Sequence, residues 1–235
     1  MRKTNSIYVY ALILALLMPS ITRIDLSAQE TGEDKLYNAV IRANMDEAKE
    51  ALASGSDINR QSDNGYTSLM WACTYSSRAE YAEVAKFLIA EGADINLRAK
   101  DGTTALMEAA SNSNEIFDLL VKKGADIKVL KDDGTGVLTK SIFGVLSRDI
   151  PLELVESVLL NGVNVNEAAQ SGSVEGWTPL HYSVSNGHEE LVNLLIKHGA
   201  DVNARAAGDI TPLSLAESNK YEKIAAILKE KGAKQ

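Results

Sequence analysis

One sequence unit recurs along most of this 235-residue chain. Its clearest copy begins with Thr-Pro-Leu-His at residues 178–181 and ends with Gly-Ala-Asp-Val-Asn at residues 199–203. The glycines that begin the closing signature lie at residues 55, 92, 124, 162, 199 and 232, so they are 37, 32, 38, 37 and 33 residues apart. A unit of this length cannot bury its apolar face alone, so the repetition predicts a stack of similar units.

Each copy has the features of two short helices followed by a turn. A Pro at the first helical position, as at Pro179 and Pro212, costs no hydrogen bond, because that N–H would be unpaired anyway. The Thr before it can accept a hydrogen bond from a free amide at the helix start. A second stretch has apolar residues at helical spacing and ends at a Gly that adopts a left-handed conformation without strain. One apolar position of the first helix recurs as Leu36, Leu69, Leu106, Leu138, Leu180 and Leu213, which we expect to face inward.

The period near 33 residues and the Thr-Pro-Leu-His opening resemble the ankyrin repeat. The resemblance covers roughly residues 33–233 and implies an all-α solenoid of about six helix-turn-helix repeats with protruding β-hairpin loops. The copies are expected near residues 33–59, 63–96, 100–128, 132–166, 174–203 and 207–233. The resemblance also implies that the hairpin tips and first helices line a concave face that binds partner proteins.

Two copies are longer than the others, and one is degenerate. The extra residues of copies two and four are expected in the turn between the helices, near residues 76–80 and 144–151. The hairpin before copy five is four residues longer, across residues 167–174. Copy four has Gly136 and Val137 where Thr and Pro are expected, which predicts that it is the least stable link of the stack.

The first 28 residues have a different character. Arg2 and Lys3 precede an apolar run at residues 7–18, which is followed by Pro19 and a small residue at Ala28. This pattern predicts a secretory signal peptide cleaved after Ala28, a short linker at residues 29–32, and a periplasmic or secreted protein. A retained membrane anchor is the alternative interpretation.

Charge narrows the classes of partner. Without the first 28 residues the chain keeps 21 basic and 31 acidic residues, a formal charge of −10. This balance argues against binding to nucleic acid, which needs a basic face, and favours solubility or a basic partner. We expect a monomer that does not contact the membrane once the signal peptide is removed.

The single cysteine, Cys73, cannot form an internal disulfide and is interpreted as a buried apolar filler.

The residues capable of chemistry have structural explanations. His181, His188 and His198 all lie in copy five, but their spacing of seven and ten residues is not that of a helical zinc pair. They occupy positions where ankyrin repeats themselves often have histidine. The acids that follow the closing glycines form one column of turn residues, Asp57, Asp94, Asp126 and Asp201. We find no phosphate loop, nucleophile elbow or zinc-hydrolase helix, and expect no catalytic residue, metal or cofactor.

Two columns vary between copies in both size and charge, which predicts that they lie outside the core. The first, two residues past the inward Leu, contains Asn38, Trp71, Glu108, Lys140, Tyr182 and Leu215. The second, just before the capping position, contains Tyr66, Thr103, Thr135, Trp177 and Ile210. In ankyrin repeats these columns line the concave face.

Aromatic residues gather in these columns. Trp and Tyr are enriched at binding hot spots, because they offer a large rigid area and one polar group. The residues predicted to bind a partner are Tyr66, Trp71, Tyr75, Trp177, Tyr182, Glu108 and Lys140. The alternative is that Trp71 or Tyr182 packs sideways on the neighbouring copy.

The function expected from the sequence is that of an exported, non-enzymatic scaffold that binds a protein through its concave face. The longer hairpin at residues 167–174 is expected to add specificity. One alternative is an inhibitor or immunity-type protein whose acidic surface masks a basic enzyme cleft. The other is an enzyme of an unrecognised type.

Overall fold

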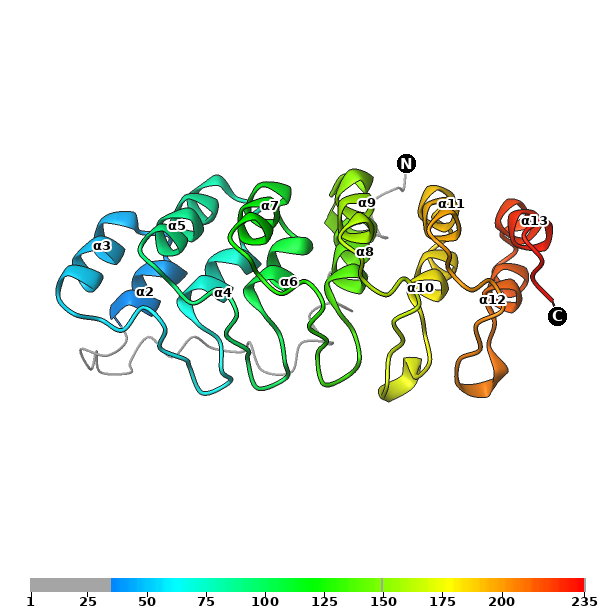
Figure 1. Ribbon diagram of the computed structural model, residues 1–235, viewed down its shortest axis with the longest axis horizontal. Helices are drawn as coiled ribbons and strands as arrows, with labels where there is room; N and C mark the ends of the chain where they lie inside the picture. The colour runs from blue at the N-terminus through cyan, green and yellow to red at the C-terminus, as the bar shows by residue number, and fades with distance from the viewer. Residues whose placement is uncertain (1–34, 149, 235) are drawn as a thin grey trace, which may run out of the picture. The chain divides into compact units, whose positions relative to one another are not determined.

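The computed structural model describes residues 35–148 and 150–234, so the predicted signal peptide and linker lie outside the described residues. Within this part the chain forms twelve α-helices in six consecutive pairs (Figure 1). The pairs are α2 (Lys35–Ile41) with α3 (Met45–Ala53), α4 (Ser68–Thr74) with α5 (Ala79–Ala90), α6 (Ala105–Ala110) with α7 (Asn114–Lys122), α8 (Val137–Arg148) with α9 (Leu152–Leu160), α10 (Pro179–Ser185) with α11 (Glu189–Lys197), and α12 (Pro212–Ser218) with α13 (Glu222–Glu230).

The pairs stack in the order of the sequence. Each first helix packs on the first helix of the next pair, from α2 through α4, α6, α8 and α10 to α12. The second helices follow, with contacts between α5 and α7 and between α11 and α13. Figure 1 shows the loops between pairs protruding together on one side of the helices. The predicted all-α ankyrin solenoid is confirmed. None of the helices in the described ranges combines the length and apolar character that crossing a membrane requires.

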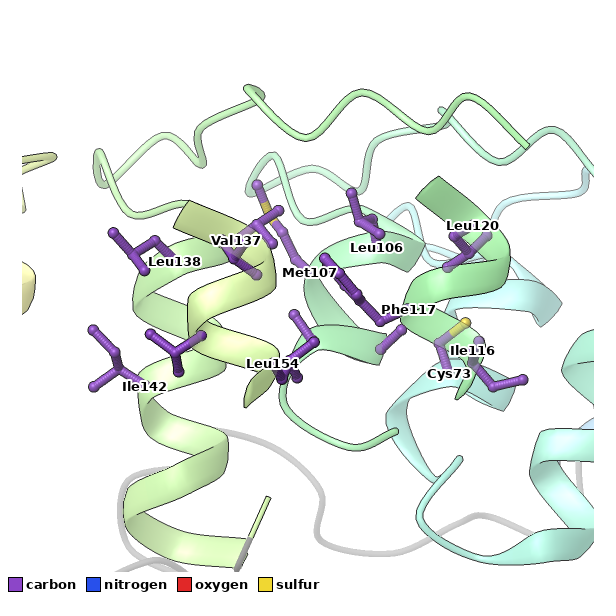
Figure 2. Packing of buried hydrophobic residues seen from close by; sticks show 14 of the residues in the cluster. Cys73, Leu106, Met107, Ile116, Phe117, Leu120, Val137, Leu138, Ile142 and Leu154 are labelled. Atoms are coloured by element: carbon purple, nitrogen blue, oxygen red, sulfur yellow. The ribbon is translucent and has the colours of Figure 1, made fainter. Parts of the chain in front are cut away.

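The core runs through the stack as one continuous cluster of apolar side chains. The six inward leucines predicted from the repeat are all buried, each at most 2% exposed. Figure 2 shows this packing around α6, α7 and α8, with Leu106, Phe117 and Leu138 among the labelled residues. Cys73 is fully buried in the same cluster, and its burial raises the pKa of its thiol, as does the nearby Glu108 carboxylate. The interpretation of Cys73 as an apolar filler is confirmed.

Threonine caps begin most of the first helices. The side chain of Thr67 accepts from the Met70 N–H (3.2 Å), and the side chain of Thr104 accepts from the Met107 N–H (3.3 Å). In α12 the caps are reciprocal. The Thr211 hydroxyl accepts from the Ser214 N–H (3.1 Å), and the Ser214 hydroxyl oxygen accepts from the Thr211 N–H (3.0 Å). These bonds satisfy amides that have no partner inside the helix.

The two longer copies differ in where their extra residues lie. In copy two the turn between α4 and α5, residues 75–78, is one residue longer than the turn between α6 and α7, and α5 itself has 12 residues where α7 has 9, so the prediction that the extra residues lie in the turn is wrong for most of them. In copy four the prediction of a longer turn is wrong, because α8 itself continues to Arg148. Gly144 lies inside this extension, where a Cβ would come within 2.9 Å of the Ser111 Cα. The absence of a side chain at Gly144 therefore lets the longer helix pack closely against the end of α6.

The hairpins contain isolated bridges in place of extended strands. Antiparallel bridges join Gln61 to Thr67, Leu130 to Gly136 and Ala206 to Ile210, and no strand is formed within the described residues. Neighbouring hairpins are joined by backbone hydrogen bonds, one at each step from copy two to copy six. These bonds are Lys100 N–H to Asn64 O (3.0 Å), Asp132 N–H to Asp101 O (3.1 Å), Gln170 N–H to Asp133 O (2.7 Å) and Ala207 N–H to Glu175 O (2.9 Å).

A ladder of asparagine side chains also joins successive copies. The Asp closes the turn in four copies, as where Asp57 Oδ1 accepts from the Asn59 N–H (2.9 Å), which confirms the turn-forming role of this column, and Asn164 does the same in copy four. The asparagine oxygen then accepts from the following copy. These rungs are Asp94 N–H to Asn59 (2.7 Å), Asp126 N–H to Asn96 (2.9 Å), Asp201 N–H to Asn166 (2.8 Å) and Lys234 N–H to Asn203 (2.8 Å). Copy three has Lys128 at this position, and a lysine has no acceptor, so this type of rung cannot form between copies three and four.

Copy four receives its helix cap from the next hairpin. Gly136, which precedes α8, has no side chain that could accept a hydrogen bond. The buried carboxylate of Glu167 takes this role, because its Oε1 accepts from the Gly136 N–H (3.1 Å), the Thr139 N–H (2.9 Å) and the Thr139 hydroxyl (2.6 Å). Glu167 is the first residue of the longer hairpin expected to add specificity, and its side chain is used for folding.

Candidate functional site

The seven residues predicted to bind a partner lie on, or directly beside, the first helices of copies two to five. We define the inner face as these seven residues together with Phe143, which the structure adds: Tyr66, Trp71, Tyr75, Glu108, Lys140, Phe143, Trp177 and Tyr182. The aromatic members gather in two clusters, and the two charged members lie between them.

The first aromatic cluster is centred on Trp71 of α4. Its indole ring stacks on Tyr75 (centroids 5.6 Å apart, planes 7° apart) and meets Tyr66 and Tyr37, each at 6.0 Å. Tyr75 in turn contacts the ring of Tyr81 at 5.2 Å. Trp71 is half-buried, and its buried Nε1 has no hydrogen-bond acceptor among the described residues. Tyr75 is 38% exposed and forms the accessible edge of this cluster.

The second aromatic cluster joins copies four and five. Tyr182 of α10 packs against Trp177 (centroids 5.2 Å) and meets Phe143 of α8 edge to face (5.0 Å, 84°). Trp177 also stacks on the imidazole of His181 at 6.1 Å. Phe143 is 38% exposed, Trp177 is half-buried, and Tyr182 is buried beneath them.

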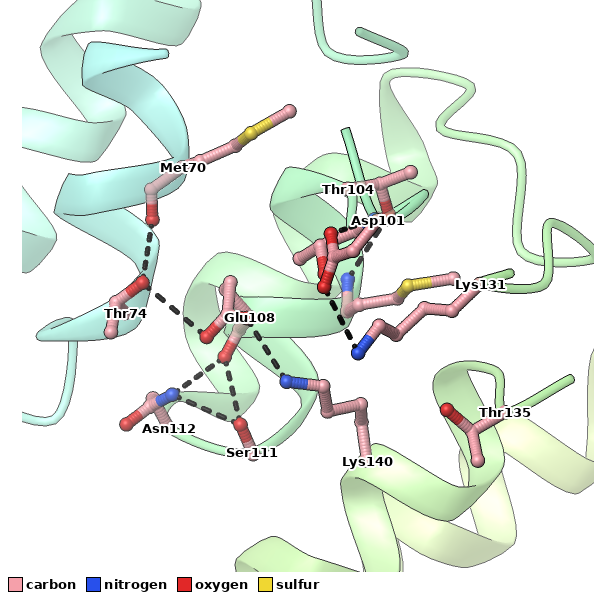
Figure 3. Close-up of polar contacts among 12 residues, drawn as sticks. Met70, Thr74, Asp101, Thr104, Glu108, Ser111, Asn112, Lys131, Thr135 and Lys140 are labelled. Carbon is pink, nitrogen blue, oxygen red and sulfur yellow. Dashed lines mark hydrogen bonds and ion pairs between the residues drawn. The ribbon is translucent and has the colours of Figure 1, made fainter. Parts of the chain in front are cut away.

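The Glu108 carboxylate connects three copies between the clusters. Its Oε1 accepts from the Tyr66 hydroxyl (3.2 Å) and pairs with the Lys140 ammonium (3.0 Å), while its Oε2 accepts from the Thr74 hydroxyl (3.3 Å). Figure 3 shows Glu108 between Thr74 of α4 and Lys140 of α8. Glu108 belongs to α6, so these bonds tie the first helices of copies two, three and four together.

The prediction that the first variable column lies outside the core is wrong for two of its members. Glu108 is 6% exposed and Tyr182 is 9% exposed. Both side chains lie against a neighbouring first helix, Glu108 through its bonds to α4 and α8 and Tyr182 through its contact with Phe143. The variation in size and charge in this column therefore reflects differences in how each pair of copies packs together. Tyr182 packs sideways on the neighbouring copy, which is the alternative that the sequence had left open.

Burial affects the two inner-face phenols. Burial, followed by the nearby Glu108 and Asp101 carboxylates, raises the pKa of Tyr66. Burial also raises the pKa of Tyr182, with a smaller contribution from the Asp133 and Glu167 carboxylates. Both hydroxyls therefore remain neutral over the physiological pH range and can donate hydrogen bonds.

Sequence comparison among the copies missed Phe143, Tyr37 and Tyr81. Phe143 lies five residues past the inward Leu138, in a column that was not singled out because the other copies have Ile41, Thr74, Ser111, Ser185 and Ser218 there. A signal was present, because Phe143 is three residues past Lys140 and so lies on the same face if the helix continues. Tyr81 is in the first turn of α5, and its hydroxyl donates to the Ile41 carbonyl (2.5 Å).

Charge is scarce along the inner helices. Helices α4, α6 and α10 contain one charged residue, Glu108, and this residue is paired with Lys140. Acidic residues instead begin the second helices, such as Asp46 and Glu47 in α3 and Glu189 and Glu190 in α11. The negative charge of the chain is therefore carried mainly away from the inner face.

A small ionic network lies in the hairpins. The Lys131 ammonium is 3.1 Å from an Asp101 carboxylate oxygen and 3.5 Å from one of Asp133. Partial burial alone would raise the pKa of Asp101, but hydrogen bonds from Thr103 and the Lys131 ammonium outweigh it and the pKa is lowered. Partial burial acts in the same way on Asp133, and hydrogen bonds from Thr135 and the Lys131 ammonium lower its pKa. This network joins the hairpins of copies three and four.

Two of the three histidines of copy five, His181 and His188, form hydrogen bonds that hold the repeat together. The Nδ1 of buried His181 accepts from the Thr178 N–H (3.2 Å), and its Nε2 lies 3.2 Å from the Ile210 carbonyl of the next hairpin. Burial lowers the pKa of His181, so the ring stays neutral. His188 accepts from the Leu191 N–H (3.3 Å) and caps α11. No group of three or more His, Cys, Asp or Glu residues in the described part of the chain is arranged to hold a metal ion.

Three relatives illustrate the similarity to known proteins. A stretch of 65 residues is 43% identical to the 2-5A-dependent ribonuclease of Homo sapiens and covers 28% of this chain but 8% of that protein. A putative ankyrin repeat protein of Rickettsia felis is 37% identical over 83 residues, which are 35% of this chain and 21% of the relative. An ankyrin repeat-containing protein of Schizosaccharomyces pombe is 33% identical over 73 residues, 31% of this chain and 33% of the relative. The matches thus span a third or less of each relative.

The comparison with protein families covers more of the chain. The family described as Ankyrin repeats (3 copies) matches residues 36–131 and 145–235. The two matched ranges contain all or most of each of the six helix pairs, with the first turns of α8 between them. Together with the stacked pairs and their shared core, this match establishes that the chain belongs to the ankyrin repeat family.

Proposed function

We propose that this chain is an exported, non-enzymatic scaffold that binds a partner protein through its inner face and hairpin tips. The observation that carries the proposal is the pair of partly exposed aromatic clusters on a face with little charge. Large aromatic side chains that are held rigidly and keep an accessible edge are typical of binding hot spots. Membership of the ankyrin repeat family supports a role in protein binding.

The inner-face residues divide into two roles in this proposal. Trp71, Tyr75, Phe143 and Trp177 contact the partner, because each retains accessible surface. Tyr66 also lines the contact surface, where its hydroxyl is oriented by Glu108. Glu108, Lys140 and Tyr182 act mainly by holding the contact residues in position, since two of them are buried and Lys140 pairs with Glu108.

Export rests on the composition of residues 1–28, which resemble a signal peptide cleaved after Ala28. In this proposal the mature protein is a periplasmic or secreted monomer without a cofactor. The mass of the protein recovered from the source cells tests this part directly. Retention of residues 1–28 would favour the membrane-anchor alternative.

Affinity capture tests the binding proposal. The wild-type chain and the Tyr75→Ala/Trp177→Ala variant are used as baits on the exported fraction of the source cells. We expect the variant to lose at least about 90% of a partner held by the wild type, because each hot-spot truncation costs 1 kcal/mol or more. The matched control is Leu160→Ala, which removes an exposed side chain at the end of α9. Equal capture by all three baits would contradict the assignment of the inner face.

An inhibitor or immunity-type protein remains the second candidate. The acidic residues at the starts of the second helices favour it, since they could mask a basic enzyme surface. Binding through these charges would weaken steeply with added salt, whereas binding through the aromatic clusters would change little. Capture at low and high salt therefore distinguishes the two.

A further inference from the structure

The two aromatic clusters present their accessible edges on the same row of helices. Tyr75 follows α4 and stacks on Trp71, while Phe143 lies in α8 and packs on Tyr182. Trp71 and Tyr182 occupy the same position in their respective copies, two residues past the inward leucine. Tyr75 and Phe143 are each 38% exposed. One ligand lying across the first helices could therefore meet both edges.

The surface between these edges is polar but electrically balanced. Glu108 is the one charged residue of α6, and its carboxylate pairs with the Lys140 ammonium and accepts from the Tyr66 hydroxyl. A charged ligand would find no unpaired opposite charge here, and burying its charge would carry a desolvation cost. This surface therefore matches an uncharged segment whose backbone provides the hydrogen bonds.

The stacking of the helices determines the distance between the clusters. Helix α4 packs on α6, and α6 packs on α8. Packed helices lie roughly 8–10 Å apart, so these two steps separate the exposed edges at Tyr75 and Phe143 by about 16–20 Å. An extended peptide advances about 3.3 Å per residue, so this distance corresponds to about five or six residues.

We propose that the inner face binds an extended, largely uncharged segment of the partner, with two aromatic or aliphatic anchor side chains about five or six residues apart. One anchor lies against Tyr75 and Trp71, and the other lies against Phe143. This inference rests on the proposed function and specifies the chemistry of the partner.

Selection from a displayed library of random peptides, long enough to span both clusters, tests this inference on the purified full chain. We expect enriched peptides to carry two apolar anchors at the stated spacing and few charges. Synthetic peptides in which the spacing is shortened or lengthened by three residues should bind at least about tenfold more weakly, as on loss of one hot-spot contact. Binding of the best peptide should change less than about threefold between low and high salt.

Variants at the two edges identify the surface that is used. Tyr75→Ser and Phe143→Ser should each weaken the best peptide at least about tenfold, while Leu160→Ser on α9 should leave its affinity unchanged. Circular dichroism and the urea midpoint show whether each variant is folded. If Tyr75→Ser does not fold, the double variant Tyr75→Phe/Phe143→Ser keeps an aromatic ring at the first edge, and its affinity still tests the second edge.

Several results would overturn the inference. These are failure to enrich any peptide, enriched peptides without preferred spacing, peptides dominated by Lys and Arg, or equal binding by the edge variants. When one of these results occurs and the Tyr75→Ala/Trp177→Ala bait nevertheless loses the natural partner, the inference fails and the proposed function stands. Both fail if that bait captures the partner as well as the wild type does.

Discussion

At the scale of single residues, two buried carboxylates link neighbouring copies, a role that the repeat pattern does not predict. Glu108 accepts hydrogen bonds from copy two and pairs with a lysine of copy four, and Glu167 caps the first helix of copy four. A buried carboxylate is tolerated where hydrogen bonds from the protein replace those it would make to water. Both residues therefore add polar links between neighbouring copies to the hairpin bonds.

We predict that Glu167→Ala lowers the free energy of unfolding by about 1–3 kcal/mol, because the Gly136 and Thr139 amides lose their acceptor. Glu167→Gln keeps a carbonyl oxygen in place and should cost less. Urea unfolding of the three proteins at neutral pH measures both differences. Equal stability of Glu167→Ala and wild type would show that water replaces the cap.

The same site should make stability depend on pH. Burial raises the pKa of Glu167, although hydrogen bonds from Thr139 and Gly136 act in the opposite direction. The native state thus binds the Glu167 proton more tightly than the unfolded state does. The stability that this difference adds is fully present below the unfolded-state pKa of about 4.3, and it is lost as the pH rises through the native-state pKa. Gln does not titrate. The stability of Glu167→Gln relative to wild type should therefore rise between pH 4 and neutrality, measured by urea unfolding, and a constant difference would contradict this.

Lys140 and Glu108 should behave as a coupled pair. Lys140→Met is expected to cost about 1–3 kcal/mol, because Glu108 stays buried without its counter-charge. Adding Glu108→Gln removes that charge and should recover most of the loss. A double-mutant cycle in urea measures the coupling. If Lys140→Met alone is neutral, the pair contributes no more than an exposed ion pair does.

At the scale of elements, each helix pair depends on links to its neighbours. The threonine caps act within a helix, whereas the asparagine ladder acts between copies. The ladder is interrupted where Lys128 replaces the asparagine. The junction between copies three and four therefore relies on hairpin bonds, the Lys131 network and the Glu108–Lys140 pair.

Restoring the missing rung is expected to stabilise the array. In Lys128→Asn, the new side-chain oxygen can accept from the Asn164 N–H, in the geometry that Asn96 has with Asp126. We predict a gain of about 0.5–1.5 kcal/mol, the usual net value of one hydrogen bond. Thermal and urea unfolding check the gain. Lys128→Gln is the matched control, and an equal gain from both would trace the effect to the loss of the lysine charge.

At the scale of the whole molecule, stability in a repeat array is approximately the sum of the copies and their interfaces. Copy four combines a cap contributed from outside the copy with an interrupted ladder. We predict that the amides of α8 and α9 exchange with deuterium sooner than those of α6 and α7 or of α10 and α11. Hydrogen exchange read by mass spectrometry follows each pair separately. Uniform protection across the copies would show that the apolar interfaces outweigh the polar links.

The sequence predicted most of this architecture because its signals are local. Leu180, the threonine caps and the closing glycines need information from one copy, and all behave as expected. The course of α8 was mispredicted, because Gly144 is compatible with either a turn or a helix, and contact with Ser111 decides between them. The burial of Glu108 and Tyr182 depends on side chains about 30 or more residues away, such as Lys140 and Phe143.

The cap that Glu167 places on α8 has a consequence for how the chain is made and rearranged. During synthesis the ribosome adds the residues of α8 before it adds Glu167, so the fourth copy lacks its helix cap until residue 167 has been made. A truncated product ending before Glu167 would leave the start of α8 open to water. For the same reason copies four and five constitute one module: duplicating, deleting or grafting either alone would separate a helix from its cap.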